Sequence, residues 1–271
     1  MLTILIFLLP SLAAAWALAA LAGWHWALAA LAFLLCFVLM HGLYVLFWWL
    51  MSGPYDRSRP IERQNPRARF ACGDAGRLLC LYGGLRPRLT GLEKLPEQGR
   101  FLFVCNHRSL FDPLLVMGQL RKWNISFVSK PSNLRIPLVG DVVYAAGFLA
   151  IDRENDRAAL KTILTAADYL KRDLCSIGIY PEGTRSRGTA LGAFHAGSFK
   201  IAQRANVPVA LACVRGTEKA GKRLFLRPTP VYLDVLELIP AETVKAMKTT
   251  ELSDYCRERI AAHLRETEGQ A

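Results

Sequence analysis

The chain carries no Lys, Arg, Asp or Glu before Asp56, and this constrains its fold more than any other feature. Residues 2 to 22 and residues 27 to 51 are almost entirely apolar. Each run is long enough to cross a hydrocarbon core of about 30 Å as a helix. We therefore expect a membrane-anchoring helical hairpin over residues 1–51, with its turn in the segment Gly23–Trp26.

The first apolar run has a competing interpretation as a cleaved signal peptide, because it contains several Ala-x-Ala sites. The basic n-region that such a peptide requires is missing, so we favour the hairpin. Pro10 can kink the first helix, and this allows a re-entrant pair as well as a spanning pair. The sequence leaves both arrangements open.

Charge is concentrated after the apolar segment, where the whole formal net charge of +12 falls. We expect residues 52–85 to form a basic linker at the membrane surface, with a short helix through Leu78–Tyr82 that ends at Gly83. The linker arginines either attract anionic lipid or are simply solvated. By the positive-inside rule they place the rest of the chain in the cytoplasm. These arginines are Arg57, Arg59, Arg63, Arg67 and Arg69.

A basic soluble part indicates anionic partners, namely phospholipid head groups, phosphorylated metabolites or nucleic acid. Nucleic acid is disfavoured, because neither zinc-finger spacing nor an aromatic-basic RNA-binding motif occurs. The seven cysteines show no CxxC pair and no disulfide framework, which is typical of reduced, mostly buried cysteines in a cytosolic domain. No His, Cys or carboxylate cluster has the spacing of metal ligands, so we expect no metal.

Strand and helix patterns alternate from residue 86 to residue 271. Most strand candidates are continuous apolar runs, as in strands covered on both faces, and the clearest helix, residues 155–171, has apolar residues at helical spacing. This order predicts an α/β domain with a mostly parallel sheet flanked by helices. The strand candidates are 101–105, 125–129, 147–151, 174–180, 207–214 and 230–236, and the shorter helix candidates are 113–121, 197–205 and 252–265.

The segment NHRSLFD, Asn106–Asp112, follows the first of these strand candidates. On one helix His107 and Asp112 would lie roughly 140° apart, because each residue advances about 100°. They can meet only if His107 lies in the loop after the strand and Asp112 at the next helix start, with Pro113 at the first helical position. An imidazole paired with a carboxylate is a general base held in one tautomer. The alternative is a loop histidine beside an N-capping aspartate.

Two more polar loops follow strand candidates. Lys130 comes after residues 125–129, and YPEGTRS, Tyr180–Ser186, comes after the run that begins at residue 174. In the second loop Gly183 shapes a turn, Glu182 can accept from hydroxyl groups, and Arg185 offers a planar fork for phosphate. Separately these are a solvated lysine and an ordinary surface turn. Three polar loops after three strands are what one crevice needs, so we expect them to converge.

Other catalytic motifs fail. GTEKAGKR, Gly216–Arg223, nearly matches a phosphate-binding P-loop, but Arg223 replaces the required Ser or Thr. No GxSxG elbow of a serine hydrolase occurs. His195 is the one rival base, and it has no carboxylate nearby in the sequence, although Glu182 could approach it in the fold.

Together these clusters resemble the glycerolipid acyltransferase family, in particular the bacterial 1-acyl-glycerol-3-phosphate acyltransferases. The likeness runs from about Arg88 to Arg215. It includes GLEKLP, the HxxxxD motif formed by His107 and Asp112, the block from KPSNLRIPLVG through GFLAIDR, and YPEGTRS. The N-terminal apolar anchor also fits that family.

The resemblance implies a membrane enzyme that acylates the free hydroxyl of 1-acyl-glycerol 3-phosphate to give phosphatidic acid. His107 is then the general base and Asp112 its orienting partner. Acyl-CoA or acyl carrier protein is the donor substrate, with no cofactor and no covalent acyl-enzyme. The expected acceptor-binding residues are Lys130, Glu182, Gly183, Thr184 and Arg185, with Glu182 on the glycerol part and the others gripping the phosphate.

The same resemblance implies a location in the bacterial inner membrane, with the catalytic domain on the cytoplasmic side. Two alternatives remain. The acceptor could be glycerol 3-phosphate, another lysophospholipid or a lyso-aminolipid, or the chain could be a non-catalytic lipid-binding protein.

Overall fold

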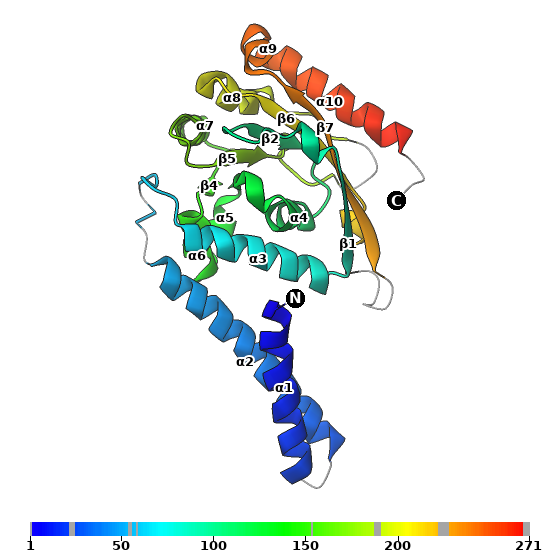
Figure 1. Ribbon diagram of the computed structural model, residues 1–271. Helices are drawn as coiled ribbons and strands as arrows, with labels where there is room; N and C mark the ends of the chain where they lie inside the picture. Colours follow the sequence, from blue (N-terminus) through cyan, green and yellow to red (C-terminus); the bar gives the residue numbers. More distant parts are fainter. Residues whose placement is uncertain are drawn as a thin grey trace.

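A seven-stranded sheet lies at the centre of the computed structural model, which describes residues 2–21, 25–53, 56–57, 59–152, 154–186, 191–221 and 228–267 (Figure 1). The strand order is β1-β7-β6-β2-β5-β3-β4. Neighbouring strands are parallel except β6 and β7, so the predicted, mostly parallel α/β sheet is confirmed. The strands are β1 (Leu85–Thr90), β2 (Leu102–Cys105), β3 (Ile125–Ser129), β4 (Leu149–Ala150), β5 (Ser176–Ile179), β6 (Val209–Arg215) and β7 (Thr229–Ile239).

Both faces of the sheet are covered, which explains why the central strands are continuous apolar runs. In β2, Leu102 and Val104 face one core while Phe103 and Cys105 face the other, because successive side chains of a strand point to opposite faces. The first core is covered by α7 (Asp156–Lys171), α8 (Lys200–Ala205), α9 (Ala241–Ala246) and α10 (Thr249–Glu266). The second is covered by α3 (Pro66–Tyr82) and α4 (Phe111–Gln119), with α6 (Val139–Ala145).

Most predicted elements correspond to observed ones within a few residues. The helix predicted over 155–171 is α7, and Asn155 caps it by accepting from the Ala158 N–H. The helix predicted over 197–205 is a 3-10 turn, η3 (Ala196–Phe199), followed by α8. Elements that the sequence patterns did not indicate are β1, α6, α9, the short helix α5 (Pro131–Leu134) and the 3-10 turns η1 (Leu92–Lys94), η2 (Arg121–Trp123) and η4 (Thr217–Lys219).

The predicted linker is wrong in one respect, because α3 begins at Pro66 and not near Leu78. Asn65 caps this helix and Pro66 occupies its first turn, which is a favourable start. The buried face of α3 consists mainly of Ala, Gly and Cys, so it lacks a clear stripe of large apolar residues. A Cβ at Gly76 would lie 2.5 Å from the Leu114 carbonyl oxygen, so α3 and α4 pack closely through small residues.

The hairpin consists of α1 (Leu2–Leu21) and α2 (Trp26–Ser52), which pack against each other. Both helices are long and apolar enough to cross a membrane, by length and composition. Most of their large apolar side chains are exposed, which fits membrane association. Of the expected turn, Gly23 and Trp24 lie outside the described residues, and Trp26 is the first residue of α2.

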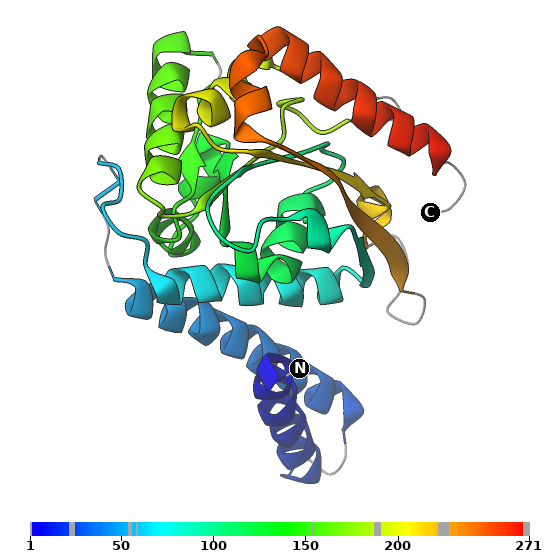
Figure 2. The same ribbon diagram turned by 45° about the horizontal axis from the view of Figure 1, so that its top comes forward.

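Polar contacts join the hairpin to the α/β domain, although its helices are apolar. Tyr44 donates a hydrogen bond of 2.7 Å to Asp74 in α3, and the Trp49 indole N–H donates to Asp141 in α6. His41 and the Tyr82 hydroxyl are 2.9 Å apart. Figures 1 and 2 show the consequence: α3 lies between the hairpin and the sheet, and the far end of the hairpin extends away from the domain.

All seven cysteines fall within the described part of the chain, and none of them forms a disulfide. Six are buried, as expected. Burial raises the pKa of several of these thiols, that of Cys256 to about 12. They are therefore neutral core side chains at neutral pH.

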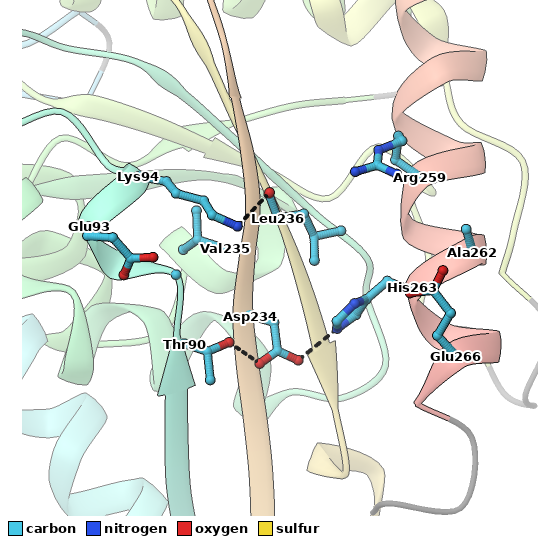
Figure 3. Close-up of a pocket in the computed structure, with 11 residues that line it drawn as sticks. Thr90, Glu93, Lys94, Asp234, Val235, Leu236, Arg259, Ala262, His263 and Glu266 are labelled. Atoms are coloured by element: carbon cyan, nitrogen blue, oxygen red, sulfur yellow. Dashed lines mark hydrogen bonds and ion pairs between the residues drawn. The ribbon is translucent and has the colours of Figure 1, made fainter.

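A buried ion cluster joins the sheet to α10. Asp234 in β7 accepts hydrogen bonds from Thr90 Oγ1 and His263 Nε2, beside an open pocket of about 340 Å³ (Figure 3). The Arg215 guanidinium also donates to Asp234, over 3.0 Å. Burial by itself raises the pKa of Asp234, but these three hydrogen bonds outweigh it and hold the pKa below the ordinary 3.8. The stabilisation is therefore complete above pH 3.8 and is lost as the pH falls through the lower, folded-state pKa.

Replacement Asp234→Asn should lower the stability of the protein by about 3 kcal/mol at pH 7, because Arg215 would keep its charge in a buried position without its partner. Thermal unfolding of the detergent-solubilised protein measures this loss. The difference from the wild type should shrink as the pH falls below 3.8. Glu93→Gln, which alters an exposed carboxylate of the same pocket, is the matched control and should leave the unfolding midpoint unchanged. Equal stability of Asp234→Asn and the control would contradict a stabilising role of the Asp234 carboxylate.

Candidate functional site

Three polar loops lie at one edge of the sheet, as the sequence predicts. Because β2, β5 and β3 are adjacent and parallel, their carboxyl ends meet at the same edge. His107 follows β2, the segment Tyr180–Ser186 follows β5, and Lys130 follows β3. The first two loops are in direct contact, through the hydrogen bonds described below.

The contact predicted between His107 and Asp112 is confirmed. His107 Nδ1 lies 2.8 Å from Asp112 Oδ2, across a junction between loop and helix. Helix α4 begins at Phe111, so Asp112 is its second residue, and Pro113 is third instead of first. Asp112 is therefore not an N-cap, which removes the interpretation of the pair as a loop histidine beside a helix cap.

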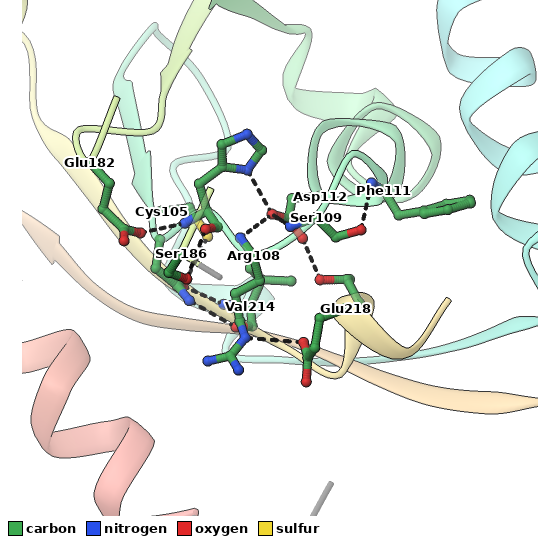
Figure 4. A network of polar contacts seen from close by, with 12 residues as sticks. Cys105, Arg108, Ser109, Phe111, Asp112, Glu182, Ser186, Val214 and Glu218 are labelled. Atoms are coloured by element: carbon green, nitrogen blue, oxygen red, sulfur yellow. Dashed lines mark hydrogen bonds and ion pairs between the residues drawn. The ribbon is translucent and has the colours of Figure 1, made fainter. Parts of the chain in front are cut away.

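The Asp112 carboxylate is completely buried, and its charge is satisfied by hydrogen bonds. The backbone N–H groups of Arg108 and Ser109 donate to Oδ2 over 2.6 and 2.8 Å (Figure 4). The Thr217 hydroxyl donates to Oδ1. Hydrogen bonds to an ionised acceptor are roughly twice as strong as neutral ones, so the loop is wound tightly around this carboxylate.

The pair with Asp112 fixes the chemical state of the His107 ring. A carboxylate accepts, so Nδ1 carries the proton and Nε2 keeps its lone pair. The side chain of His107 is 18% exposed, which leaves the ring accessible from outside. The arrangement can therefore take a proton from a hydroxyl group and stabilise the resulting imidazolium through Asp112.

The segment Tyr180–Ser186 and its Glu182 side chain hold the backbone of His107 from both sides. The His107 N–H donates to Glu182 Oε1 over 2.7 Å, and its carbonyl oxygen accepts from the Ser186 N–H over 2.8 Å. The second Glu182 oxygen accepts from the Gly192 N–H. Glu182 is 6% exposed, and both of its oxygens accept from backbone N–H groups. It therefore holds the loop that carries His107, a role that the sequence did not indicate. Contact of Glu182 with an acceptor remains a prediction.

An aromatic stack supports the His107 ring. The Tyr180 ring stacks on it, with centroids 4.3 Å apart, and the Phe127 ring stacks on Tyr180 with centroids 5.2 Å apart. Burial raises the pKa of the Tyr180 hydroxyl well above its ordinary value, so this group stays neutral. Its oxygen finds no hydrogen-bond partner in the part of the chain that the structure describes. Tyr180 thus contributes a flat surface that restricts the tilt of the imidazole.

The loop is also tied to β6 and to η4, which the sequence analysis did not connect with it. The Asn106 side chain donates to the Val214 carbonyl and accepts from the Val214 N–H, and Arg108 Nε donates to Glu218 over 3.0 Å. Glu218 belongs to the segment Gly216–Arg223, which was rejected above as a phosphate-binding P-loop. This segment therefore contributes to the site by holding the loop that carries His107. Its described part, up to Gly221, contains a 3-10 turn in place of a helix, and Arg223 lies outside the described residues.

Lys130, Thr184 and Arg185 are exposed at the same edge, whereas Gly183 is buried. Lys130 directly precedes α5, and Thr184 and Arg185 follow the turn that Gly183 closes. Gly183 has φ of +72°, a conformation that favours glycine, and its N–H donates to the Tyr180 carbonyl. Lys130 and Arg185 thus present exposed positive charges that can face an anionic ligand.

Two further expectations concern His195 and metals. The His195 side chain is exposed, and the Glu182 carboxylate bonds to the backbone of His107 and Gly192 instead of to the His195 ring. Among the residues that the structure describes, no group of three His, Cys, Asp or Glu side chains could hold a metal ion.

Comparison with known proteins identifies relatives of this chain. The model of the Acyltransferase family matches residues 86–214. The chain is 30% identical over 195 residues to the 1-acyl-sn-glycerol-3-phosphate acyltransferases of Salmonella typhimurium and Escherichia coli, a match that covers 72% of this chain and 79% of each relative. The crystal structure of the 1-acyl-sn-glycerophosphate acyltransferase PlsC from Thermotoga maritima shares the fold, with a TM-score of 0.64, 22% identity, and coverage of 84% and 89%.

Replacement Glu182→Gln should loosen the loop that carries His107. The amide can accept from one backbone N–H only, and its own NH₂ group would face the other, so about 2 kcal/mol of local stability is lost. Hydrogen exchange should become faster at residues 106–112. Glu97→Gln, an exposed carboxylate outside the site, is the control. An unchanged exchange rate at residues 106–112 in Glu182→Gln would contradict the role of Glu182 in holding the loop that carries His107.

Proposed function

The chain belongs to the family of the 1-acyl-sn-glycerol-3-phosphate acyltransferases, a group of O-acyltransferases, and from this premise we propose that it converts 1-acyl-glycerol 3-phosphate into phosphatidic acid. The observation that carries the proposal is the 2.8 Å contact of His107 Nδ1 with the buried Asp112 carboxylate, with the ring open to substrate. The donor is a fatty acyl thioester of coenzyme A or of acyl carrier protein.

The reaction needs a base, because a hydroxyl group is a poor nucleophile near neutral pH. His107 Nε2 takes the proton of the acceptor hydroxyl while its oxygen attacks the thioester carbonyl. The bond between the acceptor oxygen and the acyl carbon forms, and the bond between that carbon and the thioester sulfur breaks. The thiolate that leaves takes the proton from the His107 imidazolium. Asp112 stabilises that imidazolium, and base assistance of this kind contributes about 10²- to 10⁴-fold. The acyl group passes directly between substrates, without a covalent acyl-enzyme.

The acceptor phosphate is bound by cations at the same edge of the sheet. Lys130 and Arg185 are exposed in the loops that follow β3 and β5, two strands that lie on the same side of β2 and its catalytic loop. Arg185 can bind phosphate through two parallel N–H groups, and the turn at Gly183 and Thr184 presents it. The Glu182 oxygens each accept one backbone N–H and keep lone pairs for a glycerol hydroxyl.

Membrane attachment follows from the substrates, since acceptor and product are both lipids. The hairpin of α1 and α2 provides it, and its polar contacts with α3 and α6 keep the catalytic domain at a fixed position relative to the bilayer. The arginines after α2 favour the cytoplasmic side of a bacterial inner membrane. The side-chain ion pair of Arg57 with Asp141 supports an ordered junction there.

Replacement His107→Ala should lower kcat at least about 10³-fold, because both base assistance and the positioning of the proton are lost. Purified protein, a lysophosphatidic acid acceptor and an acyl-CoA donor measure it through thiol release. His195→Ala removes an exposed histidine and serves as the control with full activity. A His107→Ala protein with an unchanged unfolding midpoint and substantial activity would exclude His107 as the base.

Replacement Arg185→Ala or Lys130→Ala should raise KM for phosphate-bearing acceptors about tenfold or more, since a charge-assisted contact is removed. Acceptors without a phosphate, such as monoacylglycerol, should be unaffected, so an acceptor panel separates the two groups. Lys171→Ala removes an exposed cation at the last residue of α7, near the start of β5 and away from the carboxyl edge of the sheet, and should change neither. Equal loss on all acceptors would contradict a phosphate-binding role, and wild-type preference for an acceptor without phosphate would overturn the proposed substrate.

A further inference from the structure

Thr217 reaches the site from a distant part of the chain. It lies in η4, directly after β6, and its hydroxyl donates to Asp112 Oδ1 across 105 residues of sequence. Both residues are completely buried. Neither the HxxxxD motif nor YPEGTRS contains Thr217.

The two oxygens of Asp112 are held in different ways. Oδ2 accepts from His107 Nδ1 and from two backbone N–H groups of its own loop. Within the described residues, the hydrogen bond to Oδ1 comes from Thr217. The side-chain torsion that turns a carboxylate has a broad energy profile, so bonds on one oxygen alone leave the plane free to tilt. A donor on Oδ1 fixes the plane and thereby aims Oδ2 at the imidazole.

The position of Thr217 is itself well defined. Gly216 before it has φ of +84°, and a Cβ there would lie 2.7 Å from the Pro230 carbonyl oxygen, so the backbone turns closely against β7. Glu218 after it forms an ion pair of 3.0 Å with Arg108, one residue from His107. Thr is β-branched and therefore stiff at χ1. The hydroxyl is held by its surroundings and does not have to be ordered by Asp112.

We propose that Thr217 is a positioning residue for the proposed acyl transfer, acting through Asp112 on the orientation of His107. This inference rests on the proposed function. Loss of the hydroxyl leaves the carboxylate charge in place but releases its plane. The proton transfer step is then impaired, while binding of acceptor and donor is not.

The test compares Thr217→Val, which replaces the hydroxyl with a methyl group of similar size, and Thr217→Ser, which keeps the hydroxyl. Thr217→Val should lower kcat about 10- to 100-fold with both KM values within about twofold, and Thr217→Ser should recover most of the loss. Hydrogen exchange at the Arg108 and Ser109 amides, which bond to Asp112, should become faster in Thr217→Val. Thr162→Val removes a hydroxyl that donates to the Ala150 carbonyl, outside the site, and should change neither readout.

Unchanged kcat in Thr217→Val, an effect on KM alone, or a Thr217→Ser protein as impaired as Thr217→Val would each overturn the inference. If Thr217→Val does not fold, the smaller Thr217→Ala replaces it against the same serine variant. His107→Ala separates the two levels of the argument. Activity retained in His107→Ala defeats the proposed base, whereas an inactive His107→Ala with an unaffected Thr217→Val defeats only the role of Thr217. The amide exchange readout remains decisive even if no acceptor is turned over.

Discussion

The buried carboxylate of Asp112 is the group on which the architecture of the site depends. A charge without exposure to water is tolerated only when donors surround it, and here they come from the His107 ring, from the backbone of the same loop and from Thr217 in η4. The shape of the loop is therefore the shape needed to wrap one carboxylate. The same need draws the end of β6 against the start of α4.

The sheet supplies the second half of this arrangement. Because β2 lies between β5 and β6, its loop receives support from both neighbours. Glu182 and Ser186 hold the backbone of His107 from the β5 side, and Val214 pairs with Asn106 from the β6 side. Such rigidity would serve the general base that we propose, since its ring would have to meet a hydroxyl and a thioester at one fixed position.

The hairpin is joined to the α/β domain by polar side chains. A helix that only had to contact lipid would not need them. The Tyr44 hydroxyl and the Trp49 indole donate hydrogen bonds to carboxylates on α3 and α6, and His41 contacts the Tyr82 hydroxyl at the end of α3. The outward faces of both hairpin helices remain apolar. Helix α3 mediates between the two parts, since it packs on the sheet through small residues on one side and meets the hairpin on the other. A fixed orientation of this kind would suit the lipid substrates that we propose.

The apolar hairpin, the covered strands β2 to β7, helix α7 and the convergence of three polar loops could be predicted from local patterns, because burial imposes a period on the residues themselves. The meeting of His107 with Asp112 followed from spacing across a strand, loop and helix. Helix α3 was shortened in the prediction, because Ala, Gly and Cys give no strong stripe. The partners of Glu182, the stack on Tyr180 and the bond from Thr217 were decided by tertiary structure alone. Each depends on which strands are neighbours in the sheet, because the bond of His107 to Glu182 joins residues 75 positions apart and that of Thr217 to Asp112 joins residues 105 positions apart. No local period in the sequence encodes such a pairing.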